Sequence, residues 1–488
     1  MVSELLGSVG ISAHQLYIGG KWTDSASSER FLLTNPKDGS GLVEVALGSE
    51  EDVVRAVDAA ERAQPAWQAV SAIERGNILL RLADLMDEHT EQLARLAMLE
   101  HGKTLATARG EVGFASLIIR YTAWSARHLS GEIRHDENPS EQLWTQRVPF
   151  GVVAGITPWN FPLAVAARKI GPALLTGNAL VLKPHELTPL ATLFVAELAA
   201  RAGVPSGILN VVLGHGRTVG NKLVTESRIR MISMTGSSRG GREIYAAAAP
   251  GLKVVRLELG GKAPFIVLND ADIDKAVGAA LASKFYAGGQ VCTANERMYI
   301  QEGVYDQFME KFVAGVNALK VGDPEADVAF GPWVSSAEVE KLDRIADEAK
   351  ADGAQQLNDA PQLEEIHQKG RWTFPRVFEV KDNTPRLMRE ETFGPIVAAL
   401  KVSDFEEAVA YANQTEYGLT AFVWTDSNRK IMRSVQELEF GEIFVNRGNG
   451  ESVHGFHTGF KASGLGGEDG MHGIEGYLRK KSVYNNYS

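Results

Sequence analysis

From residue 150 onward, short apolar runs alternate with segments of helical periodicity. The runs in the first half are 152–156, 179–183, 208–213, 230–234 and 253–259. They are rich in Val, Ile and Leu, and helix-like stretches such as ATLFVAELAARAG lie between them. Strands of this composition separated by helices are typical of βαβ units, in which helices cover both faces of a parallel sheet. The alternation therefore predicts an α/β fold.

A second alternation predicts a second α/β domain. It begins with the runs 265–269 and 297–301, and the helical stretch YDQFMEKFVAGVNAL follows them. We expect the two domains to join near 258–262. Apolar residues recur at spacings of three and four within 51–127, which predicts helices that belong to the first domain. The length of 488 residues is enough for about three domains of ordinary size.

Two segments have strand character but no apolar core of their own. They are 128–148 (HLSGEIRHDENPSEQLWTQRV) and 476–488 (GYLRKKSVYNNYS). Such appendages suit an oligomer contact, and a surface hairpin with a loose tail is the alternative interpretation.

Composition excludes several classes of protein. The 50 basic and 61 acidic residues give a net charge of −11 without a basic tract, so neither nucleic acid nor an anionic membrane is an expected partner. The most apolar stretch, 151–182, is interrupted by Pro158, Arg168 and Lys169, which a membrane span tolerates badly. The N-terminal segment has no basic region followed by a long apolar core, so we expect no secretory signal and a cytoplasmic location.

Three residues are candidates for catalysis. Cys292, the only cysteine, follows two glycines in AGGQVC; an ionised thiol is a strong nucleophile, although a lone cysteine is more often a small buried apolar residue. Glu258 ends an apolar strand, where burial would raise its pKa toward the range of a general base; pairing with Lys262 is the alternative. Asn160, in ITPWNFP, can donate to an oxyanion or simply complete a turn.

Several weaker signals point to a nucleotide. GHGRTVG (214–220) and TGSSRGG (235–241) each follow an apolar run, and a helix that begins there would present its amides to a pyrophosphate. Lys183 and Glu186 follow another run, at the sheet edge where a ribose could be held. Each signal alone is more often an ordinary turn, but together at successive strand ends they favour a dinucleotide.

Seven motifs in order resemble the aldehyde dehydrogenase superfamily. They are ITPWNFP, KPHELTP, SMTGSSRGG, LELGGKAP, GGQVC, EETFGP and NQTEYGLTA, and the resemblance runs from about Tyr17 to the end of the chain. It implies a homodimer or homotetramer with a Rossmann-type cofactor domain, an α/β catalytic domain and a small β oligomerisation element. The implied bounds are 1–127 and 149–257 for the NAD-binding domain, 258–475 for the catalytic domain, and 128–148 and 476–488 for the oligomerisation element.

The resemblance also implies a mechanism. Cys292 would add to an aldehyde to give a thiohemiacetal, whose oxyanion is held by the Asn160 amide and the Cys292 backbone N–H. Hydride transfer to the nicotinamide would leave a thioester, and Glu258 would activate the water that hydrolyses it. NAD is favoured over NADP because Glu186 would repel a 2′-phosphate. The residues that match cofactor contacts are Thr157, Trp159, Lys183, Glu186, Gly220, Ser237, Leu259, Glu391 and Phe393.

The segment 446–473 resembles the lactaldehyde/glycolaldehyde dehydrogenase branch, which implies a small hydroxyaldehyde as substrate. The residues that match substrate contacts are Arg168, Thr293, Glu451 and His457. Thr293 departs from the branch, which usually has Asn there, and Gly450 stands where an aromatic residue is expected.

Other functions remain open at this point. Arg168, Arg447, His457 and Lys461 could together bind an anionic semialdehyde or sulfolactaldehyde, or they could form a solvated basic rim. A cofactor-independent cysteine hydrolase or thioesterase is an alternative from another class, although no papain-type signature surrounds Cys292. No HExxH motif or Cys/His cluster is present, so no metal is expected.

Overall fold

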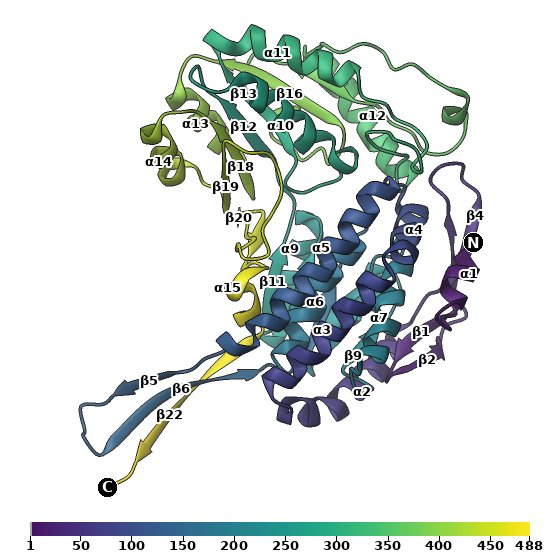
Figure 1. Ribbon diagram of the computed structural model, residues 1–488, viewed down its shortest axis with the longest axis vertical. Helices are drawn as coiled ribbons and strands as arrows, with labels where there is room; N and C mark the ends of the chain where they lie inside the picture. The colour runs from purple at the N-terminus through teal and green to yellow at the C-terminus, as the bar shows by residue number, and fades with distance from the viewer. Residues whose placement is uncertain (1) are drawn as a thin grey trace.

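A computed structural model describes residues 2–488, which form two units that each contain a mainly parallel sheet (Figure 1). The unit that holds the N-terminal half lies below the other in the view of Figure 1. A third, narrow sheet extends from the lower unit and carries the C-terminus at its tip. The α/β fold class is therefore confirmed.

The first sheet has the strand order β2-β1-β9-β8-β7-β10-β11-β21, and β9-β8-β7-β10-β11 run parallel. Each apolar run predicted in the first half of the chain falls on one of these parallel strands. The strands are β1 (Gln15–Ile18), β2 (Lys21–Asp24), β7 (Val152–Ile156), β8 (Ala179–Lys183), β9 (Leu209–Val211), β10 (Ile229–Thr235), β11 (Val254–Glu258) and β21 (Gly464–Leu465).

Helices cover this sheet, as the sequence periodicity predicts. Those of the N-terminal segment are α1 (Val2–Gly7), α2 (Glu50–Ala69), α3 (Ala72–Glu88), α4 (Thr90–His101) and α5 (Leu105–Trp124). Those that connect the parallel strands are α6 (Pro162–Leu175), α7 (Leu190–Ala202), α8 (Asn221–Thr225) and α9 (Ser238–Ala248). A two-stranded sheet of β3 (Arg30–Thr34) and β4 (Gly41–Ala46) lies beside them.

The second sheet has the order β14-β15-β16-β13-β12-β18-β19 and is parallel except for β14. Its strands are β12 (Ala263–Val267), β13 (Asn295–Gln301), β14 (Gln355–Gln356), β15 (Arg376–Glu379), β16 (Ile396–Val402), β18 (Thr420–Trp424) and β19 (Glu442–Val445). Its helices are α10 (Ile273–Phe285), α11 (Glu302–Asn317), α12 (Ser336–Ala351), α13 (Phe405–Asn413) and α14 (Asn428–Glu437).

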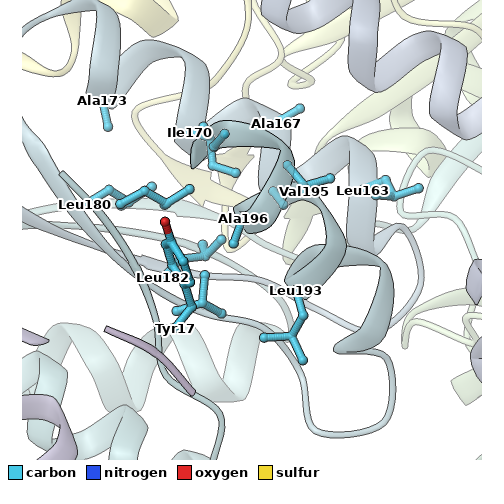
Figure 2. Close-up of a cluster of buried hydrophobic side chains, with 14 of the residues drawn as sticks. Tyr17, Leu163, Ala167, Ile170, Ala173, Leu180, Leu182, Leu193, Val195 and Ala196 are labelled. Carbon is cyan, nitrogen blue, oxygen red and sulfur yellow. The ribbon is translucent and has the colours of Figure 1, made fainter. Parts of the chain in front are cut away.

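Each unit has its own apolar core. Figure 2 shows part of the first, where Ile170 of α6 and Val195 of α7 lie near Leu180 and Leu182 of β8. Every residue of α6 is buried, so close packing fixes this helix against the sheet. The second core is formed by residues between 263 and 440.

The chain returns to the first unit after residue 446. Val453, Ile474 and Tyr477 belong to the first core, and β21 joins the first sheet beside β11. The remaining elements here are β17 (Tyr417–Gly418), β20 (Phe460–Lys461) and α15 (Gly470–Glu475). The segment 446–477 thus spans both units, and we call it the return segment.

The two predicted appendages pair with each other. Strands β5 (Glu132–His135), β6 (Glu141–Pro149) and β22 (Leu478–Asn486) form an antiparallel sheet in the order β22-β6-β5. Its apolar side chains are open to solvent: Ile133 is 75% exposed, Tyr484 72% and Tyr487 64%. Within residues 2–488, no helix combines the length and the apolar character that a bilayer span needs.

Gly102 offers a test of how tightly the two units meet. It ends α4 at φ 93°, and a Cβ there would lie 2.5 Å from the carbonyl oxygen of Pro332 in the second unit. Gly39 has a similar φ of 77° but open space around it. A positive φ strains any residue with a side chain at both positions, but only at Gly102 would the added Cβ also clash with a neighbour. We therefore expect Gly102→Ala to lower the free energy of unfolding by about 2–4 kcal/mol and Gly39→Ala by about 1 kcal/mol. Thermal unfolding followed by circular dichroism compares them, and equal losses would contradict the close contact.

Candidate active site

One cavity of about 550 Å³ lies at the carboxyl ends of β7, β10 and β11. This is the edge at which parallel α/β sheets bind ligands. Residues from the second unit and from the return segment complete the wall. Eleven of the predicted site residues line this cavity: Asn160, Trp159, Arg168, Ser237, Glu258, Leu259, Cys292, Glu391, Phe393, Glu451 and His457.

Cys292 is positioned by a tight turn. The 3-10 helix Tyr286–Gly289 contains three residues with positive φ, and Gly289 leaves no room for a Cβ because the Gly394 carbonyl oxygen would lie 2.5 Å away. Cys292 itself is partly buried and lines the cavity. Burial raises the pKa of the thiol, and a hydrogen bond with His457 acts in the opposite direction. The glycines that precede Cys292 in the sequence therefore permit the tight turn that places its side chain in the cavity wall.

Asn160 is held from both sides. Its side-chain Nδ2 donates to the Gln290 carbonyl at 2.9 Å, which ties it to the segment just before Cys292. Its own backbone carbonyl accepts from Nζ of Lys103 at 2.6 Å. Lys103 pairs at 2.5 Å with Glu111, which in turn accepts from two amides in the first turn of α6. Neither Lys103 nor Glu111 was anticipated from sequence, because 57 residues separate Lys103 from Asn160.

Glu258 lies at the end of β11 with both carboxyl oxygens buried and without a hydrogen-bond partner. The nearest cation is His457, whose Nε2 lies 3.9 Å from Oε2. Burial raises the pKa of Glu258 to about 8, although His457 opposes the shift. The alternative partner Lys262 is not available, because its Nζ binds Glu296 at 2.7 Å. An unpartnered carboxyl with such a pKa has the properties of a general base.

Two adjacent cations of α6 meet two adjacent acids of the return segment. Arg168 binds Asp469, with a shortest distance of 2.6 Å, and also Glu451 at 2.8 Å. Lys169 forms an ion pair with Glu468 and donates to a threonine hydroxyl at the end of β10. Sequence reasoning missed Lys169, Glu468 and Asp469 as site residues; the only signal was a charged pair inside the apolar stretch 151–182.

The four cations that could bind an anionic substrate do not gather in the cavity. Only Arg168 and His457 line it, and carboxylates bind both. Arg447 is exposed and donates to the Gly450 carbonyl. Lys461 lies 3.3 Å from Glu439, away from the cavity wall. The four cations therefore do not meet as a joint anion clamp, because two of them lie outside the cavity wall and carboxylates bind the other two.

Thr293 lies behind the wall. It is fully buried, and its hydroxyl donates to Asn449 at 2.9 Å and to Glu451 at 3.3 Å. Four other predicted residues also do not line the cavity: Thr157, Lys183, Glu186 and Gly220.

Lys183 and Glu186 meet at the end of β8. Their charged atoms lie 3.4 Å apart, and Nδ1 of His215 lies 3.2 Å from the other oxygen of Glu186. Burial acts to raise the pKa of Glu186, but Lys183, His185 and His215 together outweigh burial, and the pKa falls to about 2. Thr157 beside them has a buried hydroxyl without a partner. An ionised carboxylate beside a lysine and a free hydroxyl fits the ribose of a dinucleotide.

The loop around Glu391 is held by a buried carboxylate. Glu296 accepts from the amide of Phe393 at 2.7 Å and from the preceding amide at 2.8 Å. Phe393 has φ 56°, and its ring centroid lies 5.5 Å from that of Trp159 in an edge contact. Glu391 accepts from the amide of Gly261 at 2.8 Å, and burial raises its pKa to about 7. Glu296 thus shapes the cavity wall without lining it, which no local sequence pattern indicated.

No group of three or more His, Cys, Asp or Glu residues with the geometry of a metal site occurs among residues 2–488.

Comparison with known proteins identifies the family. The Aldehyde dehydrogenase family model matches residues 22–483, so the chain belongs to this family of oxidoreductases that act on aldehydes. A 3,6-anhydro-alpha-L-galactose dehydrogenase of Vibrio sp. is 43% identical over 97% of this chain and 99% of its own. The solved structure of a 3,6-anhydro-L-galactose dehydrogenase in complex with NAP has a TM-score of 0.95 and 44% identity, covering 97% of this chain and all of the other.

Two further solved structures bear on the branch and on the cofactor. Lactaldehyde dehydrogenase from Escherichia coli is 38% identical with a TM-score of 0.94, over 97% of this chain and 99% of the other. PnpE in complex with nicotinamide adenine dinucleotide is 37% identical with a TM-score of 0.95, over 97% and 98%. The resemblance inferred from the motifs is thereby confirmed at the level of family and fold.

The raised pKa of Glu258 predicts how turnover depends on pH. A general base works in its deprotonated form, so if Glu258 has this role we expect the steady-state rate of NAD(P)H formation to rise as the pH passes about 8. The burst of product in the first turnover, which precedes the step assigned to Glu258, should keep a constant amplitude over the same pH range. Stopped-flow absorbance at 340 nm measures both. Glu258→Gln should keep a burst of about one NADH per site and lose the later phase, whereas a wild-type rate that is flat from pH 6.5 to 9 would argue against this assignment.

Proposed function

We propose that this enzyme catalyses the NAD-dependent oxidation of a small, neutral hydroxyaldehyde to its carboxylic acid. The observation that carries the proposal is that Cys292, Glu258 and Asn160, which lie far apart in sequence, line one cavity. Family membership supports the reaction class and disfavours the cofactor-independent hydrolase.

The side chains suggest the following sequence of steps. The Cys292 thiolate adds to the aldehyde carbon, and the resulting oxyanion accepts from Nδ2–H of Asn160 and from the Cys292 backbone N–H. A bound nicotinamide dinucleotide supplies the acceptor for the hydride that leaves this carbon. Glu258 takes a proton from water, whose oxygen attacks the thioester carbon; the C–S bond breaks, and the carboxylic acid and the Cys292 thiolate are released while the proton stays on Glu258. The carboxyl oxygens of Glu258 have no protein donor that would compete with that water for a hydrogen bond.

The dinucleotide would be held along the carboxyl edge of the first sheet. Lys183 and Glu186 suit the adenosine ribose, and Thr157 and Gly220 lie near this end of the sheet. Because Glu186 is ionised, it accepts from ribose hydroxyls and repels a 2′-phosphate, which favours NAD over NADP. The other expected contacts, nearer the reacting carbon, are Trp159, Ser237, Leu259, Glu391 and Phe393.

The charge balance of the cavity supports a neutral substrate. Arg168 is neutralised by Asp469 and Glu451, so a substrate carboxylate would find no free cation there. Glu451 and His457 offer hydrogen bonds to hydroxyl groups, and Gly450 lines the cavity beside them. Relatives named as dehydrogenases of lactaldehyde and of 3,6-anhydro-galactose suggest the size range of the substrate.

We further propose a cytoplasmic homodimer or homotetramer. The exposed apolar residues of β5 and β22 would be covered by a second copy of the chain, which is the role expected for the segments 128–148 and 476–488.

The nucleophile can be tested by Cys292→Ala. We expect no detectable NADH formation, because no other cysteine can form the thiohemiacetal. Dinucleotide binding, measured by calorimetry, should remain within about twofold of wild type, since Cys292 does not bind the adenosine end. Normal NADH formation by this variant would exclude the covalent mechanism.

The substrate class can be tested with an aldehyde panel. We expect lactaldehyde, glycolaldehyde and 3,6-anhydro-L-galactose with NAD to give kcat/KM values at least tenfold above those of succinic semialdehyde, sulfolactaldehyde and betaine aldehyde. With NADP in place of NAD, kcat/KM should be lower. Glu186→Gln should reduce this difference in kcat/KM between the two cofactors. A preference for an anionic aldehyde would overturn the neutral-substrate proposal while leaving the reaction class intact.

A further inference from the structure

The proposed steps at the reacting carbon assign no role to the pair that His457 forms with Glu442. Nδ1 of His457 lies 3.0 Å from Oε2 of Glu442, at the start of β19. The same Glu442 oxygen accepts from the hydroxyl of Thr420 at 3.2 Å, which fixes it from the neighbouring strand. The other ring nitrogen, Nε2, faces the cavity and lies 3.9 Å from Glu258. A histidine with one nitrogen bound by a carboxylate presents its other N–H in a defined direction.

The backbone also holds His457 in place. Its N–H donates to the Glu468 carbonyl at 2.9 Å, and its carbonyl accepts from the Glu468 N–H at 2.7 Å. The side chain is only 3% exposed. The ring is therefore fixed by a two-way backbone bridge and by Glu442, and it has little freedom to turn toward a ligand.

Charges surround this ring on every side. The groups that face it are Glu442 of β19, Glu258 of β11, Glu451, Glu468 and Asp469 of the return segment, and the Cys292 thiol. Burial lowers the pKa of His457, but Glu442 and Glu451 outweigh burial and hold that pKa well above its usual value. Arg168, the nearest other cation, is itself bound by Asp469 and Glu451. The carboxylates around the ring therefore favour its imidazolium form.

We propose that His457, fixed by Glu442, is the counter-charge that allows Cys292 to ionise in the free enzyme. Cys292 and His457 line the same cavity, where His457 acts to lower the pKa of the thiol against the effect of burial. An imidazolium that donates to sulfur stabilises the thiolate, whereas burial alone favours the neutral thiol. Glu442 is a positioning residue in this scheme, because it does not line the cavity and acts on the sulfur only through His457.

This role deepens the proposed function, since the reacting form of Cys292 is the thiolate. In the free enzyme the thiol proton leaves to solvent, and the negative sulfur remains beside the positive ring. Glu258 is then free for the later step, the activation of water. The arrangement separates two tasks that one carboxylate would otherwise have to perform in turn.

The lone cysteine makes a direct test available. Iodoacetamide forms one S–C bond with the Cys292 thiolate and releases iodide, so mass spectrometry of the whole chain reports a single adduct. The rate is measured between pH 5.5 and 10 on the free protein, without aldehyde or dinucleotide. Thiolate absorbance at 240 nm gives a second, reagent-free titration of the same group.

We expect His457→Asn to alkylate at least tenfold more slowly than wild type at pH 7.5, with its inflection at least one pH unit higher. Glu442→Gln should shift the inflection in the same direction by a smaller amount. His454→Asn is the matched control: His454 is exposed, lies three residues away and contacts only Tyr121 among aromatic rings. Its profile should overlay that of wild type.

The same inflection in wild type and His457→Asn would overturn the proposal. If His457→Asn does not fold, Glu442→Gln decides, and an unchanged inflection in that variant overturns it equally. Because the assay needs no substrate, its failure leaves the dehydrogenase proposal standing. Conversely, inactivity toward every aldehyde would remove the proposed function without changing the alkylation result.

Discussion

The site depends on two adjacent ion pairs that join α6 to the return segment, Arg168 with Asp469 and Lys169 with Glu468. All four side chains are almost fully buried, where an unpaired charge would cost several kcal/mol. Such pairs add little net stability compared with apolar residues. They do require α6 and the return segment to be aligned correctly, because a buried charge that loses its partner is strongly destabilising. They fix the return segment against the first unit, and this segment carries Glu451 and His457 into the cavity.

Burial then separates the acids of the cavity by function. Glu258 has no hydrogen-bond partner and stays protonated until the pH approaches 8, whereas Glu451, bound to Arg168, has its pKa lowered to about 2 despite its burial. Two carboxyl groups in one cavity thus have opposite protonation states at neutral pH, because one is paired with a cation and the other is not. When the environments of two carboxyl groups move their pKa values apart, the group with the raised pKa can exchange protons during the reaction, and the group with the lowered pKa remains a fixed negative charge.

The sequence predicts the fold better than it predicts the site. The strands β7 and β8 coincide with the apolar runs at 152–156 and 179–183, because parallel strands buried on both faces read as continuous apolar runs. Cys292, Glu258 and Asn160 could be predicted because each lies in a motif with glycine or proline beside it.

The supporting residues could not be predicted in the same way. Lys103 contacts Asn160 from 57 residues away, and Glu442 contacts His457 from 15 residues away on a different element. Their neighbours in the chain give no local sign of either role. Arg168, Arg447 and Lys461 read as a basic set, but their partners depend on tertiary packing: carboxylates bind Arg168 and Lys461, whereas Arg447 donates to a backbone carbonyl. Charge counts along a chain cannot report such pairing, so the sequence left an anion clamp and a solvated basic rim equally open.

The single thiol has a consequence for oxidative damage. Oxidation of Cys292 to a sulfenic acid would normally be reversed through a disulfide with a second cysteine, but this chain of 488 residues contains none. Repair must then come from a small external thiol that enters through the aldehyde's own route. A bound aldehyde or dinucleotide would shield the sulfur from oxidant and reductant alike, so the enzyme is safest from peroxide while it is working.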